Sequence, residues 1–295
     1  MPLLPQPIQI PDGVTVVKRS EVLIGHLLGE GEFSSVYFGR LRINGETTNV
    51  AVKILKDNTL YNPAYEHEIS TLDILAGCPH IIKLLGVIID GEKSIITELM
   101  TSDMYTILKS LRQENDFSAT TGARLQKFCL EVAEALQYMT TMKIVHRDVA
   151  ARNVLISHDD TAKIGDFGLA RDIYQDLVYQ RHPSQRHCKV PVRWMSPESL
   201  TENIYTLSSD MWSFGVLMWE VATLGDMPFY NIDSEQLVER LKAGDRLPRP
   251  PNCSEDFYEL MKKCWRLDPK DRVTANVAVR ILKHYIAYKR LPVAC

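Results

Sequence analysis

The residue pattern of this 295-residue chain changes near residue 100, and that change limits the class of fold. Before it, short runs of β-branched and aromatic residues separated by turn residues predict strands, with one helix at residues 63–76. After it, long amphipathic stretches at 121–142 and 208–223 predict a mainly helical region. We therefore expect an α+β chain in two lobes that meet near Thr97–Asp103. The expected strands are Val22–Leu28, Val36–Leu41, Val50–Leu55, Leu84–Ile89 and Ser94–Leu99.

Composition excludes several other classes of protein. The net charge of −3 argues against a nucleic-acid partner. The six cysteines show no C-x-x-C pair and no regular spacing, so we expect reduced thiols rather than a disulfide frame or a zinc site. No run approaches the roughly 18–20 apolar residues of a spanning helix, so no membrane segment is expected in this chain. The proline-containing residues 1–19 are expected to form an extended lead-in.

Two acidic residues and an asparagine lie close together in the helical half of the chain. Asp148 and Asn153 belong to the run His146–Asn153, and Asp166 precedes Phe167-Gly168. Such groups suit phosphoryl transfer from a nucleotide: Asp148 can take the proton from an attacking hydroxyl, while Asn153 and Asp166 can hold magnesium against the phosphates. Each residue alone could be structural or part of a turn, but the three together favour phosphoryl transfer.

A glycine-containing turn is expected between the first two strands. Gly29 and Gly31 would let the backbone approach phosphates without Cβ clashes. Taken alone, a plain hairpin turn explains these glycines better. Ser34 stands where the usual glycine-rich pattern has a third glycine. A second turn signal, Asn44-Gly45, predicts a hairpin between the second and third strands.

Lys53 lies on the third expected strand, where a solvated lysine is the ordinary interpretation. Glu68 on the following helix favours a different one, because a lysine–glutamate pair between strand and helix can orient the ammonium onto nucleotide phosphates. Glu66 is the alternative partner, but it is two residues away, or about 200° around the helix. Glu68 lies one turn before Leu72 on the inward face, so we expect the pair Lys53–Glu68.

With these residues in place, positions 20–291 resemble a protein kinase catalytic domain, and specifically the receptor-type tyrosine kinases. Ala150-Ala151-Arg152 resembles the tyrosine-kinase form of the catalytic loop, and Pro191–Glu198 resembles its substrate loop. Ser208–Gly215 and Cys264–Arg272 complete the family pattern. The resemblance implies a bilobal kinase fold with an N-lobe at 20–99, a hinge at 97–103 and a C-lobe at 104–291.

The resemblance also implies that the chain transfers the γ-phosphoryl of ATP to tyrosine hydroxyls of proteins. The expected cofactors are ATP and Mg²⁺, with Mn²⁺ as an alternative metal. The expected catalytic residues are Asp148, Arg152, Lys53 and Glu68, and the expected metal ligands are Asn153 and Asp166. Thr97 would control access to a pocket behind the adenine. The backbones of Glu98 and Met100 would hydrogen-bond the edge of the adenine. The nucleotide-binding set is Leu28, Gly29, Gly31, Val36, Ala51, Lys53, Thr97, Glu98, Met100 and Leu155.

By the same resemblance, Tyr174 and Tyr179 are expected regulatory sites, with Tyr179 preferred. A phosphate there would add roughly two negative charges and could pair with Arg147; exposed loop tyrosines without a role are the alternative. The basic segment 181–189 departs from the family. Its His182, His187 and Cys188 lack a fourth metal ligand, so a solvated loop is favoured. Whether the segment serves a phosphotyrosine or substrate choice stays open.

The resemblance also implies structural roles for three further residues. Glu198 and Arg272 should form a buried ion pair, and Asp210 should accept hydrogen bonds from the catalytic-loop backbone.

The expected partners are tyrosine-bearing proteins and a second copy of the chain for trans-autophosphorylation. The expected location is the cytoplasm, with the cytoplasmic part of a plasma-membrane receptor as the alternative. Two rival functions stay open: a pseudokinase scaffold and a serine/threonine or dual-specificity kinase.

Overall fold

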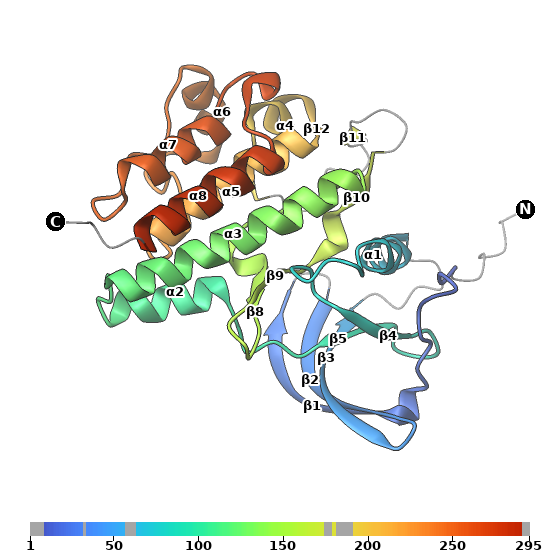
Figure 1. Ribbon diagram of the computed structural model, residues 1–295. Helices are drawn as coiled ribbons and strands as arrows, with labels where there is room; N and C mark the ends of the chain where they lie inside the picture. Colours follow the sequence, from blue (N-terminus) through green and yellow to red (C-terminus); the bar gives the residue numbers. More distant parts are fainter. Residues whose placement is uncertain (1–8, 32–33, 57–62, 174–178, 181–190, 291–295) are drawn as a thin grey trace, which may run out of the picture.

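The computed structural model describes residues 9–31, 34–56, 63–173, 179–180 and 191–290. Figure 1 shows a smaller lobe built on a β-sheet and a larger lobe built mainly from helices. The chain passes from one to the other after the strand β5 (Ser94–Glu98) and enters the larger lobe at the short strand β6 (Ser102–Asp103). The predicted α+β fold in two lobes is confirmed.

The small lobe is a five-stranded antiparallel sheet with the strand order β1-β2-β3-β5-β4. Asn44 and Gly45 both have positive φ, 53° and 87°, as a two-residue hairpin between β2 and β3 requires. The hairpin prediction is confirmed. The strands besides β5 are β1 (Val22–Glu30), β2 (Ser34–Ile43), β3 (Glu46–Leu55) and β4 (Leu84–Ile88).

The helix α1 (Pro63–Ile74) is fixed beside this sheet by its apolar face. Tyr65, Ile69 and Leu72 are all at most 2% exposed, at the helical spacing that the sequence shows. The Tyr65 hydroxyl also donates to the carbonyl oxygen of Ile88 in β4 at 2.9 Å. Because α1 carries Glu68, this packing determines how far Glu68 lies from β3.

The described part of the expected lead-in packs against the small lobe. The backbone N–H of Val17 donates to the carbonyl of Val87 at 2.8 Å, and the N–H of Val87 donates to Thr15 at 2.9 Å. Val17 is only 3% exposed. Residues 15–17 therefore extend the pairing at the β4 edge of the sheet.

The large lobe consists of seven α-helices, short strands and single-turn 3₁₀ helices among the residues described (Figure 1). The helices are α2 (Met104–Gln113), α3 (Ala119–Thr141), α4 (Pro197–Glu202), α5 (Leu207–Ala222), α6 (Ser234–Lys242), α7 (Glu255–Cys264) and α8 (Ala275–Arg290). The strands are β7 (Ile144–Val145), β8 (Val154–Ile156), β9 (Ala162–Ile164), β10 (Arg171–Asp172), β11 (Tyr179–Gln180) and β12 (Ile204–Tyr205). The 3₁₀ helices are η2 (Ala151–Asn153), η3 (Phe167–Leu169), η5 (Val192–Trp194) and η6 (Pro269–Asp271), with η1 (Arg19–Glu21) in the small lobe. Within these residues, no helix is both long and apolar enough to cross a membrane.

The helix α5 forms the centre of the large lobe. All residues from Ser209 to Val221 are buried, so the helix is apolar on every side rather than on one face. Its N-terminus is capped by Thr206, whose hydroxyl oxygen accepts from the N–H of Ser209 at 3.2 Å. The buried polar side chains of this helix, which are Ser209, Asp210, Ser213 and Glu220, therefore need partners.

Gly215 allows α5 and α7 to approach closely. A Cβ added at Gly215 would lie 2.6 Å from Nε1 of Trp265 and 2.7 Å from Cβ of Cys264. We expect Gly215→Ala to lower the free energy of unfolding by about 1–3 kcal/mol, because overpacking outweighs the better helix propensity of alanine.

Gly122 in α3 is the matched control, because a Cβ there meets no atom within 4 Å. Gly122→Ala should raise the free energy of unfolding by about 0.5–1 kcal/mol. Urea denaturation measures both changes. Equal shifts of the two variants in the same direction would contradict the close-packing account.

Candidate active site

The start of the run His146–Asn153 is hydrogen-bonded to α5. The backbone N–H groups of His146 and Arg147 donate to the two carboxylate oxygens of Asp210 at 2.7 and 2.9 Å. Arg147 has a φ of 74°, a strained value for a residue with a side chain, and these two bonds help to maintain it. Burial raises the pKa of Asp210 to about 6, although the hydrogen bonds oppose the rise. The contact expected of Asp210 is present.

Asp148 lies between two neighbours of its own loop. Nη2 of Arg152 donates to Oδ1 of Asp148, and Nδ2 of Asn153 donates to the Asp148 backbone carbonyl at 2.8 Å. The Asp148 side chain is 14% exposed, so the carboxylate is accessible at one side. Because the amide nitrogen of Asn153 is engaged, its amide oxygen is the atom left to bind a cation. The loop therefore presents a carboxylate and an amide oxygen next to each other.

Lys53 connects the two lobes. Its ammonium nitrogen lies 2.7 Å from Oε1 of Glu68 on α1 and 2.9 Å from Oδ1 of Asp166 in the large lobe. Burial by itself lowers the pKa of Lys53, but the charges of Glu68 and Asp166 outweigh it and the pKa is raised. The ammonium therefore stays charged, as phosphate binding requires. The predicted Lys53–Glu68 pair is present.

Asp166 begins a 3₁₀ turn that aims its side chain away from the core. Its backbone φ is 57°. The next residue, Phe167, is 1% exposed, and its ring packs edge-on against the ring of His146 with 4.8 Å between the ring centroids. The Asp166 side chain is 56% exposed, and the Lys53 charge holds its pKa below the ordinary value. Asp166 thus offers an ionised carboxylate to solvent near Lys53.

The donor set suits a hard cation. Asp166 and Asn153 offer oxygen atoms, which Mg²⁺ and Mn²⁺ prefer. Within the described part of the chain, no group of three or more His, Cys, Asp or Glu side chains could hold a metal by itself. A metal at Asp166 and Asn153 would complete its coordination with oxygens of a bound phosphate or of water.

The expected nucleotide-binding residues come from both lobes. In the sheet, Val36 is paired with Lys53 and Ala51 with Thr97, which brings three strands to one face. Leu28 is 47% exposed on β1, and Leu155 lies on β8 in the large lobe. The Glu98 N–H donates to the Lys83 carbonyl at 3.1 Å, so an adenine contact from Glu98 must come through its own carbonyl. The glycines Gly29 and Gly31 and the residue Met100 occupy β1, the turn after it and the segment after β5. Their nucleotide roles stay predictions.

Arg272 joins the substrate-loop region to the end of the large lobe. Its two terminal nitrogens donate to the Glu198 carboxylate at 2.6 and 2.7 Å, and its side chain is fully buried. Three backbone carbonyls, those of Arg266, Ser208 and Leu267, accept its remaining hydrogen bonds at 2.8–3.1 Å. The expected ion pair is present, and every described donor nitrogen of Arg272 has an acceptor.

The comparison with known proteins identifies the family. The family model for protein tyrosine and serine/threonine kinases matches residues 22–282. The chain belongs to this kinase family. The receptor-type tyrosine kinase resemblance predicted from the sequence is confirmed by the relatives that follow.

The chain is similar to several curated receptor kinases and a viral kinase. It is 37% identical over 267 residues to the insulin-like growth factor 1 receptor of Bos taurus, covering 87% of this chain and 41% of the relative. It is 32% identical over 302 residues to the tyrosine-protein kinase receptor torso of Bombyx mori, covering 88% and 37%. It is 36% identical over 269 residues to the tyrosine-protein kinase transforming protein RYK of avian retrovirus RPL30, covering 88% and 60%. The chain thus spans less than two thirds of each of these relatives.

Tyr174, a predicted regulatory site of this kinase, lies outside the described residues. The basic segment 181–189, whose role the sequence leaves open, also lies outside them. Tyr179 is described at the backbone level, where it pairs with Tyr205 between β11 and β12. Arg147, the expected phosphate partner, is 7% exposed; its guanidinium carbon lies 4.1 Å from the ring centroid of Tyr205 and Nη1 donates to Leu169. A phosphate contact would have to replace or add to these interactions.

Sequence reasoning missed two residues at the kinase site. Glu220 follows the apolar run Trp212–Trp219 and is 2% exposed. Lys163 on β9 donates to both oxygens of Glu98 at 2.7 and 2.9 Å, linking the interlobe segment to the strand before Asp166. A charged residue within a run of otherwise buried positions was the available signal for Glu220, because such a group needs a partner.

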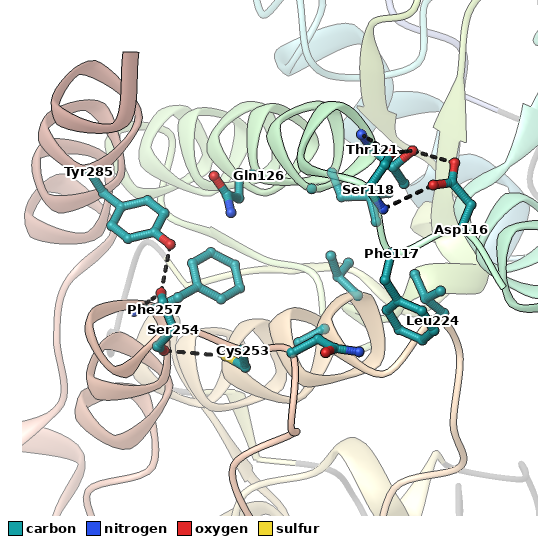
Figure 2. A pocket seen from close by; sticks show the side chains of 15 residues that line it. Asp116, Phe117, Ser118, Thr121, Gln126, Leu224, Cys253, Ser254, Phe257 and Tyr285 are labelled. Atoms are coloured by element: carbon teal, nitrogen blue, oxygen red, sulfur yellow. Dashed lines mark hydrogen bonds between the residues drawn. The ribbon is translucent and has the colours of Figure 1, made fainter. Parts of the chain in front are cut away.

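The kinase also has a small pocket away from these residues. It measures about 100 Å³ and lies between α3, α5, α7 and α8 (Figure 2). Leu224, Phe257 and Gln126 face it, and Tyr285 shares a hydrogen bond of 2.6 Å with Ser254 at one end. None of the predicted nucleotide, metal or catalytic residues lines it, so it is separate from the candidate active site.

Glu220 gives the stability of this kinase a pH dependence opposite to that of an ion-paired surface carboxylate. Burial raises its pKa to about 7, against an ordinary value of 4.5. Between these values the folded chain keeps a proton that the unfolded chain has released, so the free energy of unfolding falls as the pH rises from 4.5 through 7. The contribution is fully present below about pH 4.5 and is lost above about pH 7.

We expect Glu220→Gln, which cannot ionise, to lack this loss. The difference in unfolding free energy, variant minus wild type, should be more positive at pH 8 than at pH 4.5 by up to about 3 kcal/mol. Urea denaturation of both proteins at the two pH values measures it. The same difference at both pH values would show that Glu220 does not titrate in this range.

Proposed function

We propose that the chain is an ATP-dependent protein tyrosine kinase domain. The observation that carries the proposal is that Lys53 lies within hydrogen-bonding distance of both Glu68 in the small lobe and Asp166 in the large lobe. Asp148 and Asn153 share one loop of the large lobe. These are the groups that bind nucleotide phosphates, hold a divalent cation and accept a hydroxyl proton.

In the proposed reaction, each residue has one task. Lys53, held by Glu68, binds and orients the phosphate oxygens of ATP. Asn153 and Asp166 would hold Mg²⁺, or Mn²⁺ as the alternative, which would offset charge on the phosphates. Asp148 orients the tyrosine hydroxyl and accepts its proton as the bond from the phenolic oxygen to the γ-phosphorus forms and ADP leaves. Arg152, hydrogen-bonded to Asp148, assists near the transferred phosphoryl group.

Tyrosine as the acceptor is supported by the substrate loop. The guanidinium of Arg152 lies 4.6 Å from the centroid of the Trp194 ring, which joins the loop Ala150-Ala151-Arg152 to η5 of the substrate loop. The relatives named tyrosine-protein kinases support the same acceptor. We infer that the acceptor site lies where these two loops meet.

Regulation, partners and location are proposals on the same basis. Autophosphorylation of Tyr179 or Tyr174 would add charge for Arg147 to bind, with a second copy of the chain as the acting enzyme. Because relatives include receptors, we propose a cytoplasmic location, with the cytoplasmic part of a plasma-membrane receptor as the alternative. The N-lobe is proposed as 20–99, the hinge as 97–103 and the C-lobe as 104–291.

Incubation with magnesium-ATP and a poly-Glu/Tyr substrate tests the function, with Asp148→Asn as the blank. We expect phosphotyrosine with the wild-type chain and none above background with the blank. Absence of phosphotyrosine at high enzyme concentration would favour a pseudokinase scaffold. Phosphoamino-acid analysis decides the acceptor, because phosphoserine alone would indicate a serine/threonine kinase.

A further inference from the structure

Glu220 contacts both loops that form the proposed acceptor site. One of its carboxylate oxygens, Oε2, accepts from the backbone N–H of Ala151 at 3.0 Å and from the indole N–H of Trp194 at 2.8 Å. Ala151 begins the 3₁₀ turn that follows Asp148, and Trp194 ends the 3₁₀ turn of the substrate loop. A single carboxylate oxygen of a buried residue therefore bridges two segments that are far apart in the sequence.

Trp194 is held by α5 at two points. Besides the indole bond to Glu220, its backbone carbonyl accepts from the hydroxyl of Ser213 at 2.8 Å. With both its ring and its backbone anchored on one helix, Trp194 has a fixed orientation. Its ring then forms the surface on which the Arg152 guanidinium rests, 4.6 Å from the ring centroid.

Arg152 connects the Trp194 ring to Asp148. The guanidinium contacts the Trp194 ring and also donates to the Asp148 carboxylate. The order of contacts is Glu220 to Trp194, Trp194 to Arg152, and Arg152 to Asp148. A second, shorter route runs from Glu220 to the backbone of Ala151, three residues after Asp148 in the same loop. Glu220 is therefore connected both to the Asp148 carboxylate and to the loop that carries it.

We propose that Glu220 is a positioning residue for the tyrosine acceptor, acting through Trp194 and Ala151 to align the substrate loop with Asp148. The inference rests on the proposed function and deepens it, because it names the residue that aligns the acceptor side of the site. Nucleotide binding depends on Lys53, Glu68 and Asp166, which Glu220 does not contact. Loss of the Glu220 contacts therefore affects the tyrosine substrate and leaves ATP binding intact.

The direct test is Trp194→Phe, which keeps an aromatic ring under Arg152 and removes only the indole donor. Trp219→Phe is the matched control: Trp219 lies on the same helix as Glu220 and donates its indole N–H to the Pro248 carbonyl, also at 2.8 Å. Glu220→Met removes the acceptor oxygen of both hydrogen bonds and keeps most of the side-chain volume. Its matched control is Glu131→Met, since Glu131 is also buried and accepts the N–H of Ala162 at 2.8 Å.

Initial rates with a tyrosine peptide and with ATP give the Michaelis constants for both substrates. For Trp194→Phe and Glu220→Met we expect kcat/KM for the peptide to fall by about 10- to 100-fold, because small displacements of reacting groups slow a reaction by such factors. Their KM for ATP, and both controls, should stay within about twofold of the wild type, since only the acceptor side is displaced. This split between substrates separates positioning from general destabilisation, which would affect ATP and peptide alike.

If Trp194→Phe and Glu220→Met lose no more activity toward the peptide than the controls do, the inference is overturned. An equal loss toward ATP and peptide would overturn it too, because it would indicate a purely structural role. If Glu220→Met does not fold, Trp194→Phe decides the question alone. A wild-type chain that makes no phosphotyrosine would refute the proposed function instead, so the two failures can be told apart.

Discussion

Asp148→Asn is expected to lower kcat for tyrosine phosphorylation by about 10²–10⁴-fold, the range found when a general base is removed. The amide cannot accept the phenol proton, but its oxygen can still accept from Arg152, so the loop should keep its shape. The hydrogen bonds of Lys53 to Glu68 and Asp166, the groups proposed to bind the nucleotide, are untouched. KM for ATP should therefore stay near the wild-type value. Initial rates with a tyrosine peptide at saturating ATP measure the effect.

Asp256→Asn is the matched control for this change. Asp256 is exposed in the first turn of α7 and belongs to no part of the proposed site. The same chemical change there should leave kcat unaltered and the unfolding free energy within about 0.5 kcal/mol. If Asp148→Asn keeps kcat within tenfold of the wild type, the proton goes to another acceptor and the role assigned to Asp148 is wrong.

Arg272→Met is expected to lower the free energy of unfolding by about 3–5 kcal/mol, since it removes one partner of a buried ion pair. The change leaves the Glu198 carboxylate, 13% exposed, without its cation. It also removes the hydrogen bonds that the Arg272 guanidinium donates to the backbone carbonyls of Arg266, Ser208 and Leu267. Methionine fills much of the volume, so a cavity is not the cause of the loss. Urea denaturation monitored by circular dichroism measures it.

Arg266→Met provides the control for Arg272, because Arg266 is exposed six residues earlier in the same segment. It should change the unfolding free energy by no more than about 0.5 kcal/mol. Glu198→Gln should cost less than Arg272→Met, because Arg272 keeps its three carbonyl acceptors. A loss below about 1 kcal/mol for Arg272→Met would show that the pair does not hold the lobe together.

The regular elements were predictable because their signals are local. Alternation in Val50–Leu55 and the turn pair Asn44-Gly45 predict β3 and its hairpin, and both are present. The predicted helix 63–76 is α1 (Pro63–Ile74), and 121–142 is α3 (Ala119–Thr141). The short strands β6, β7 and β10 were not predicted. Each has two residues, too few for a period, and each forms only because a distant strand supplies its hydrogen bonds.

The sequence by itself determined the chemistry that the chain can offer. The residue types at 53, 68, 148, 153 and 166, with their spacing, indicate phosphoryl transfer and a lysine–glutamate pair. Those inferences need no coordinates, because the motif pairs each residue type with a task. Even the choice of Glu68 over Glu66 follows from the turn of a helix.

Only the tertiary structure decided which buried groups support that chemistry. Glu220 lies 69 positions from Ala151 and 26 from Trp194, and its neighbours in the sequence are apolar. It meets these partners only because the fold packs α5 against both the catalytic loop and the substrate loop. Lys163 and Glu98 likewise meet across 65 positions. A hydrogen bond between distant segments depends on the packing of the elements that carry them, and no local pattern records it.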